Sequence, residues 1–213
     1  MKNIDFAKLV RQNIRSLKPY EAYEIPCKAK LDANESPYAI DIKHPNDVLK
    51  KLNRYPDPEA KELKKAIAKN LKINPENILL GNGSDELIYY LITTFGGPVL
   101  YPEPTFSMYG IISKALGEKP LGIPLNKDFD IDTEKMLNAN KKYKPNLIFL
   151  SSPNNPTGNK ISSEGILKII ETLNSGNCGI VVVDEAYQPF CSEKGFLPHL
   201  KDYKTLAILR TLS

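Results

Sequence analysis

Short apolar runs alternate with amphipathic stretches along most of the chain. The apolar runs are rich in β-branched residues, and they predict buried strands at Ile78–Leu80, Val99–Tyr101, Leu147–Leu150, Ile180–Val183 and Leu206–Leu209. The stretches between the runs space apolar residues three or four apart, which predicts helices over Asp85–Phe95, Phe106–Leu116, Thr133–Tyr143 and Ser162–Leu173. This alternation favours a mainly parallel sheet with helices on both faces, a three-layer α/β/α sandwich.

The segment before this alternation has a different pattern. Apolar residues at helical spacing between Phe6 and Leu17 predict an amphipathic helix over residues 2–17, and the proline-rich, polar text that follows predicts an extended arm. Pro58 is expected to start a further helix. We therefore divide the chain into a helix and arm over residues 1–45 and a large α/β domain over residues 46–213.

Composition narrows the possible functions. The 213 residues are 41% hydrophobic and 25% charged, as in an ordinary globular protein, and the net charge of +4 comes from dispersed lysines, which does not favour nucleic-acid binding. The three cysteines match no metal-ligand spacing, which indicates reduced thiols and no metal site. Neither a secretory leader nor a bilayer-spanning apolar run is present, so we expect a soluble cytoplasmic protein.

Unusual polar motifs follow four of the predicted strands. They are GNGSDE at 81–86, SSPNNPTG at 151–158, DEAY at 184–187 and RTLS at 210–213. In an open α/β sheet the ligand lies beyond the carboxyl ends of the strands. The four motifs are therefore candidates for one binding site.

The GNGSDE motif could bind a phosphate. Its glycines allow the backbone to approach an anion, and the free amides of Ser84 and Asp85 would then point at it from the first turn of a helix. The alternative is a glycine turn followed by a Ser or Asp N-cap. The third glycine of the dinucleotide fingerprint is missing, which disfavours a Rossmann site.

Asp184 ends a strand of apolar residues and should have a specific partner, because burying a lone carboxylate is costly. It could pair with a protonated pyridine nitrogen, cap a loop or bind Mg²⁺. Tyr187 could donate a hydrogen bond to a phenolic oxygen of the same ring, and the rigid turn at 153–158 could aim the Asn155 amide there. An aromatic residue of segment 101–109 could stack on a planar cofactor, although core packing is the commoner role.

Taken together, GNGSDE, YPEPTFSMY, SSPNNPTG, VVVDEAY and RTLS resemble the fold-type-I pyridoxal-phosphate (PLP) aminotransferases over nearly the whole chain. The front motifs IRSLKPY, LDANESPY and NRYPDPEAKELKKAIA are similar to those of the histidinol-phosphate aminotransferases. The resemblance implies a histidine-biosynthesis enzyme that exchanges an amino group between glutamate and imidazole-acetol phosphate, giving 2-oxoglutarate and histidinol phosphate.

The resemblance also implies a role for each matching residue. The residues expected at the cofactor phosphate are Gly83, Ser84, Asp85, Thr211 and Ser213. Tyr109 is expected to stack on the cofactor ring, Asn155 and Tyr187 to contact its phenolic oxygen, and Asp184 to pair with its nitrogen. A PLP site is therefore expected within residues 46–213.

Three further residues are implied to act on the substrate or across a subunit interface. Tyr55 is expected to reach the cofactor phosphate of the neighbouring subunit, which makes a homodimer part of the prediction. Tyr20 and Asn34 are expected to face the substrate, with Tyr20 near its phosphate group.

The chain departs from the family pattern where it ends, at Ser213. The pattern continues with the Schiff-base lysine, so this lysine is expected directly after Ser213 and no catalytic residue is expected in the chain itself. A small C-terminal domain is expected beyond it. The alternatives are another aminotransferase or a phosphothreonine-type decarboxylase of the same superfamily, a non-catalytic relative without the lysine, and an unrelated nucleotide-binding α/β domain.

Overall fold

The computed structural model describes residues 10–17, 26, 28–29, 38, 42–43, 45–50, 52–176 and 179–212. The described chain divides into two compact units, one made of the described residues of 1–20 together with 82–212, and one made of those of 21–81. The predicted boundary at residue 45 between an arm and a large domain stays a prediction. Among the described residues, no helix is long and apolar enough to cross a membrane.

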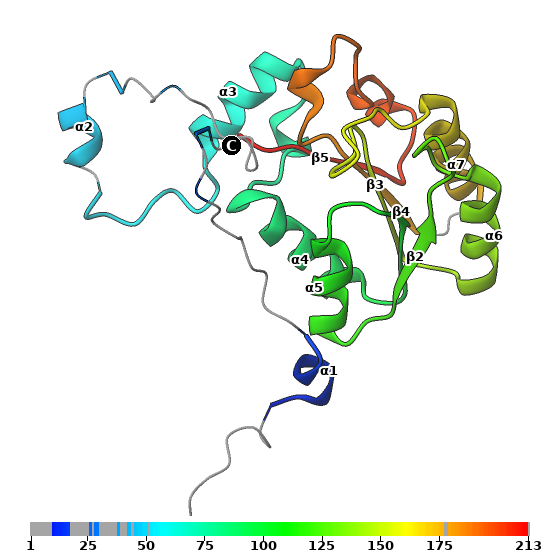
Figure 1. Cartoon of the computed structure of the whole chain (residues 1–213). Coiled ribbons are helices and arrows are strands. Elements are labelled where there is room, and N and C mark those ends of the chain that lie inside the picture. The colour runs from blue at the N-terminus through cyan, green and yellow to red at the C-terminus, as the bar shows by residue number, and fades with distance from the viewer. Residues whose placement is uncertain are drawn as a thin grey trace, which may run out of the picture. The chain divides into compact units, whose positions relative to one another are not determined.

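A five-stranded parallel sheet forms the centre of the first unit (Figure 1). Its strand order is β2-β1-β3-β4-β5, and neighbouring strands pair in parallel. The strands are β1 (Val99–Glu103), β2 (Pro120–Pro124), β3 (Leu147–Ser151), β4 (Ile180–Asp184) and β5 (Leu206–Leu209). The prediction of a mainly parallel sheet is confirmed.

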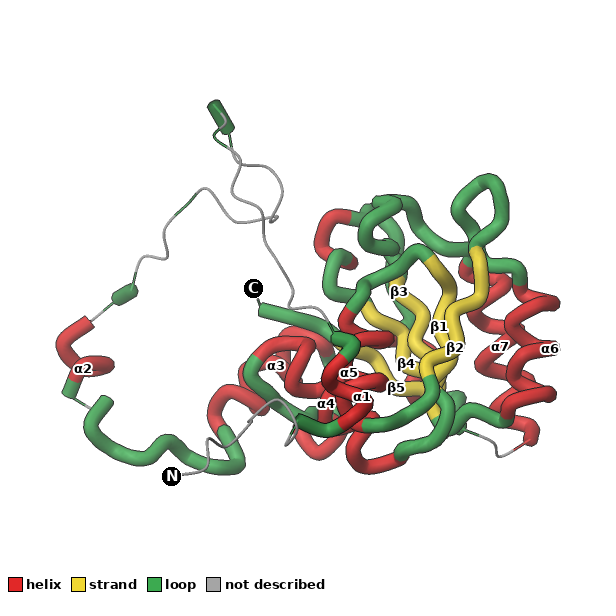
Figure 2. Tube along the Cα trace, turned by 60° about the horizontal axis from the view of Figure 1, so that its bottom comes forward, coloured by secondary structure: helices red, strands yellow, loops and turns green. Residues whose placement is uncertain are grey.

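Helices cover both faces of the sheet (Figure 2). On one face α4 (Gly83–Phe95) and α5 (Met108–Leu116) pack against a buried cluster that includes Phe149 and Val182. On the other face α6 (Thr133–Tyr143) and α7 (Ser163–Gly176) pack against a second cluster that includes Ile148 and Val183. Alternate residues of each strand therefore belong to opposite layers, which confirms the three-layer α/β/α sandwich.

The same alternation decides where Asp184 points. Asp184 is the last residue of β4 and lies two positions after Val182, so its side chain shares the face that α4 and α5 cover. In the parallel register Asp184 lies opposite Ser151, the last residue of β3. The ends of these two strands are therefore adjacent in the sheet.

The strands differ from the prediction at two places. Residues 78–80 form no strand, because a strand needs a hydrogen-bonded neighbour and no described segment pairs with them; Leu79 is 70% exposed. The strand β2 was not predicted, because Pro120 and Pro124 interrupt its apolar pattern. As β2 lies at the edge of the sheet, prolines are tolerated there.

The remaining elements are short or lie near the chain's start. They are α1 (Gln12–Arg15), α2 (Pro45–Leu49), α3 (Lys61–Leu71) and the 3-10 turns η2 (Pro75–Asn77), η3 (Gln188–Phe190) and η4 (Leu197–Lys201). The helix predicted over residues 2–17 is described only from residue 10, and of these residues only Gln12–Arg15 are helical. The Asn13 side chain of α1 donates to the carbonyls of Lys114 and Ala115 at 2.7 and 2.9 Å. α3 begins three residues after Pro58, because the Asp57 carboxylate accepts the amides of Glu59 and Lys61 and holds a turn there.

Ile170 on α7 tests the packing of the α6–α7 layer. The side chain is fully buried against the sheet, so Ile170→Ala should lower the free energy of unfolding by about 2–5 kcal/mol. Lys168→Ala, two residues earlier on the exposed side of the same helix, should change it by less than about 0.5 kcal/mol. Urea unfolding of both variants checks this, and equal destabilisation would contradict the assigned layer.

Candidate active site

The Asp184 carboxylate lies at the centre of the candidate site. The residue is 3% exposed. Its Oδ2 accepts a hydrogen bond from the Tyr109 hydroxyl at 2.6 Å, and its Oδ1 accepts one from the backbone N–H of Ala186 at 3.0 Å. No lysine, arginine or histidine among the described residues pairs with it. The carboxylate is thus fixed by two neutral donors and has no counter-charge.

The surroundings of Asp184 are acidic. Burial raises the pKa of its carboxyl, the bonds from Tyr109 and Ala186 lower it, and the nearby carboxylates of Glu185 and Asp85 raise it further. A buried carboxylate among other carboxylates favours a cationic ligand group, because such a group supplies the missing counter-charge. The influence of Asp85 also indicates that the first turn of α4 lies near Asp184.

The start of α4 is open to an anion. Gly83 has a φ of +77°, and no atom other than its own chain neighbours and helix backbone lies within 4 Å of the position where a side chain would begin. The Glu86 carboxylate, four residues on, accepts the amide of Asn82, while the amides of the first turn have no partner within a helix. Asn82 occupies the N-cap position of α4, so neither Ser84 nor Asp85 is the N-cap residue that the alternative interpretation of the motif required.

The turn after β3 and the DEAY segment come together as the resemblance implies. The Nδ2 of Asn155 donates to the Tyr187 hydroxyl at 3.3 Å, and both side chains are half-buried. The two polar groups therefore present a donor pair next to the end of β4.

Tyr109 is buried in a position that differs from the predicted one. Its ring is 0% exposed and stacks on Phe149, with 4.7 Å between centroids and 12° between planes. Phe106 contacts it edge-on at 5.7 Å. The predicted stacking of Tyr109 on a cofactor is not supported by this geometry, because the ring has no open face.

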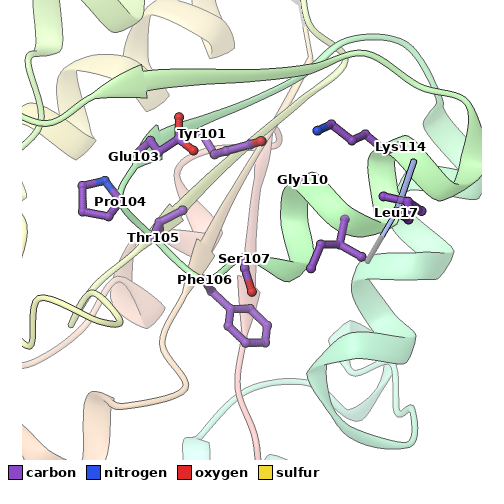
Figure 3. A pocket seen from close by; sticks show the side chains of 10 residues that line it. Leu17, Tyr101, Glu103, Pro104, Thr105, Phe106, Ser107, Gly110 and Lys114 are labelled. Atoms are coloured by element: carbon purple, nitrogen blue, oxygen red, sulfur yellow. The ribbon is translucent and has the colours of Figure 1, made fainter. Parts of the chain in front are cut away.

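A cavity of about 280 Å³ lies beside β1 and the start of α5 (Figure 3). Glu103, Ser107 and Lys114 line it, and the Phe106 ring points away from Glu103 and Lys114 in this view. Phe106 also lines this cavity, whereas none of the residues predicted to bind the cofactor does.

Comparisons with known proteins show the family of the chain. Residues 24–213 match the family described as Aminotransferase class I and II. The chain belongs to this family. It is 42% identical to a histidinol-phosphate aminotransferase from Caldanaerobacter subterraneus subsp. tengcongensis, over 96% of this chain and 59% of that relative.

Solved structures give the same result for this class I and II aminotransferase chain. The histidinol-phosphate aminotransferase from Clostridium acetobutylicum matches with a TM-score of 0.71 at 27% identity, over 78% of this chain and 49% of that one. The enzyme from Sinorhizobium meliloti, solved in complex with pyridoxal-5'-phosphate, matches with a TM-score of 0.70 at 26% identity, over 79% and 46%. The chain thus spans about half to three-fifths of the length of these relatives.

Asn154 is a residue of the aminotransferase fold that the sequence analysis missed. Its Oδ1 accepts from the Thr105 hydroxyl at 2.7 Å, and its Nδ2 donates to the Pro104 carbonyl at 3.0 Å and the Thr157 hydroxyl at 2.8 Å. These bonds tie the loop after β1 to the loop after β3, next to Phe106 and Asn155. Asn154 stands beside Asn155 in the sequence, and its burial (1% exposed) separates it from the half-buried Asn155.

A second missed feature links the ends of β4 and β5. Glu185 is 1% exposed, and its Oε2 accepts bonds from Arg210 Nε at 2.9 Å and Nη2 at 2.7 Å. Its other oxygen accepts the amide of Phe196, and a side chain at Gly195 would collide with the same carboxylate. The pair therefore fixes the direction in which the chain leaves β5, toward Thr211.

Two of the other predicted site residues are described. Thr211 is half-buried two residues after β5, and Tyr55 is fully exposed in the second unit. Tyr20, Asn34 and Ser213 lie outside the described residues. No group of His, Cys, Asp or Glu side chains in the described chain could hold a metal ion, so the Mg²⁺ alternative for Asp184 has no donor set there.

Arg210→Gln tests the link between β4 and β5. The substitution leaves the buried Glu185 carboxylate without its cation and should lower the free energy of unfolding. Because Arg210 is itself 32% exposed, we expect a loss of about 3 kcal/mol, the low end of the range for breaking a buried ion pair. Lys65→Gln removes the exposed ion pair with Glu62 and should cost less than about 1 kcal/mol. Thermal unfolding of both variants measures the difference; two similar small losses would show that the Glu185 pair does not hold the strand ends.

Proposed function

We propose that the chain is the cofactor-binding part of a PLP-dependent aminotransferase of histidine biosynthesis. The proposed reaction converts imidazole-acetol phosphate and glutamate to histidinol phosphate and 2-oxoglutarate, reversibly. Membership of the class I and II aminotransferases supports the reaction type, and the similarity to histidinol-phosphate aminotransferases supports the substrates. Because the chain spans 59% of that relative's length, the proposal concerns the whole protein in which this chain lies.

The observation that carries the proposal is the unpaired carboxylate of Asp184. A protonated pyridine nitrogen would supply the cation that its acidic surroundings lack. When bound, PLP supplies an electron sink for carbanion chemistry at the substrate's α-carbon. Asp184 would keep the proton on the ring nitrogen, and this charge is what makes the sink effective.

The other residues around Asp184 fit the same group. The free amides of the first turn of α4, at Gly83, Ser84 and Asp85, would hold the cofactor phosphate, with Thr211 and Ser213 from the segment after β5. Asn155 and Tyr187 would donate to the phenolic oxygen from the opposite edge of the ring. The ring would thus be held at its nitrogen, its oxygen and its phosphate by different loops.

Phe106 is the proposed stacking residue in place of Tyr109. Its side chain is partly exposed directly before α5, and it packs edge-on against the buried Tyr109 ring. An exposed ring face next to the site can cover a planar cofactor, whereas the fully buried ring of Tyr109 cannot.

Four further roles of the proposal rest on the family resemblance. Tyr55 would contact the cofactor phosphate across a homodimer interface, and its complete exposure leaves its side chain accessible. Tyr20 and Asn34 would face the substrate. A lysine directly after Ser213 would carry the cofactor and move the proton in a cytoplasmic enzyme.

The activity is tested on the full-length protein. With histidinol phosphate and 2-oxoglutarate, it should release glutamate in a PLP-dependent manner, and aromatic amino acids or phosphothreonine should be poor substrates. Preference for one of those compounds would overturn the proposed substrate while leaving the cofactor assignment in place. Absence of any PLP-dependent turnover would overturn the proposed function.

Asp184→Asn separates function from stability. Losing the charge at the ring nitrogen should lower kcat by about 10²–10³-fold, the range for removing one preorganised electrostatic group. Since burial raises the pKa of Asp184 above the ordinary 3.8, the folded protein binds this proton more tightly than the unfolded chain does. The stability of the cofactor-free protein therefore falls as pH rises through the folded pKa, and the asparagine variant escapes this loss.

At pH 7 the cofactor-free Asp184→Asn protein should be at least as stable as the unsubstituted protein, because the amide can still accept from Ala186 and donate to Tyr109. Asp128→Asn, at an exposed position, serves as the control and should alter neither turnover nor stability. Unchanged turnover in Asp184→Asn would remove the role assigned to this carboxylate.

Phe106→Leu tests the stacking assignment. The substitution keeps an apolar side chain but removes the aromatic face, so PLP should bind about 2- to 10-fold more weakly, as expected for an aromatic contact worth about 0.5–1.5 kcal/mol. Phe95→Leu, on an exposed part of α4, is the matched control and should bind PLP normally. Equal affinities in the two variants, measured by equilibrium dialysis, would contradict the assignment.

A further inference from the structure

Tyr109 joins helix α5 to the end of β4 through a single buried hydrogen bond. Its hydroxyl donates to Oδ2 of Asp184 at 2.6 Å, and its ring is held between Phe149 on one side and the edge of Phe106. The Ser113 hydroxyl donates to the Tyr109 carbonyl at 2.6 Å, one turn later in α5. Neither the ring nor the hydroxyl has room to turn away, because the residue is 0% exposed.

The direction of this hydrogen bond follows from the chemistry of the two groups. Burial raises the pKa of the Tyr109 phenol well above its ordinary value of 10, and the Asp184 charge raises it further. The phenol therefore keeps its proton, and a neutral phenol donates while an ionised carboxylate only accepts. A hydrogen bond to an ionised acceptor is roughly twice as strong as one between neutral groups.

The carboxylate is fixed at both oxygens. Tyr109 donates to Oδ2 and the Ala186 amide donates to Oδ1, so the plane of the carboxyl group cannot rotate without losing one bond. The other titratable neighbours work against its charge, since Asp85 on α4 and Glu185 next in the chain are both acidic. Tyr187 is a further titratable neighbour among the described residues and acts on the Tyr109 phenol.

We infer that Tyr109 is a positioning residue that keeps Asp184 ionised and oriented for a cationic ligand group, the cofactor's ring nitrogen if the proposed function holds. The phenol stabilises the carboxylate charge that burial and two neighbouring carboxylates oppose. Tyr109 thereby acts on the cofactor through Asp184 and not by touching the ring, which gives this buried aromatic a role other than the stacking role implied by the resemblance.

The test is the pH dependence of PLP affinity in the full-length protein. PLP should bind less tightly as pH falls and Asp184 becomes protonated. We call this fall in PLP affinity at low pH the acid limb. In Tyr109→Phe the midpoint of the acid limb should move up by about one to two pH units, which corresponds to the loss of one hydrogen bond to a charged group. A tyrosine that only fills the core would weaken binding equally at every pH, without moving the limb.

Tyr101→Phe is the matched control. Tyr101 belongs to the same aromatic cluster, with its ring centroid 6.1 Å from that of Tyr109, and its hydroxyl bonds no carboxylate among the described residues. Its acid limb should coincide with that of the unsubstituted protein. If Tyr109→Phe also leaves the limb in place while the unsubstituted protein binds PLP, the inference is overturned and the proposed function stands.

A second substitution covers the case in which Tyr109→Phe does not fold. Replacing Tyr109 with 3-fluorotyrosine keeps the shape of the side chain and makes its hydroxyl a stronger donor. The acid limb should then move down in pH, opposite to the phenylalanine variant, and an unmoved limb would overturn the inference. If the unsubstituted protein binds no PLP at any pH, the proposed function fails and the role of Tyr109 toward the ring nitrogen fails with it.

Discussion

A carboxylate buried at the end of a parallel strand costs free energy unless a cation or several donors compensate for it. Asp184 has two donors and no cation among the described residues, and its acidic neighbours increase the cost. The neighbouring strand β3 is fully buried and β5 is apolar and partly buried, so the carboxylate cannot move into solvent without disrupting the sheet. A cationic ligand would compensate for the buried charge. The carboxylate therefore lowers the stability of the ligand-free protein and favours binding at this position.

The loops around Asp184 are held by contacts that do not touch a ligand. Asn154 ties the loops after β1 and β3 together, and the Glu185–Arg210 pair ties the end of β4 to the end of β5. Both contacts are buried or partly buried, and each fixes a neighbouring residue that the proposal places at the cofactor. A rigid scaffold of this kind suits a site that must hold a planar ring at several points.

The sequence predicted the layers well, because the continuous apolar runs of β1, β3, β4 and β5 reflect burial on both faces of the sheet. The prediction missed β2, because two prolines interrupt its apolar pattern. It wrongly placed a strand at residues 78–80, which have an apolar pattern but no pairing partner among the described residues. Asn155 and Tyr187 follow adjacent strands, and a hydrogen bond joins their side chains, while their contact with a cofactor oxygen stays a prediction. The position of Tyr109 could not be predicted, because its contact with Asp184 joins segments 75 residues apart and depends on how α5 packs.

We propose that Asp184 pairs with the ring nitrogen of PLP. A structure of the full-length protein with PLP bound is the decisive measurement. We expect the ring nitrogen within hydrogen-bonding distance of the Asp184 carboxylate, with the phosphate at the first turn of α4 and Tyr109 still bonded to Asp184. A cofactor bound elsewhere, or a ring nitrogen facing away from Asp184, would contradict it.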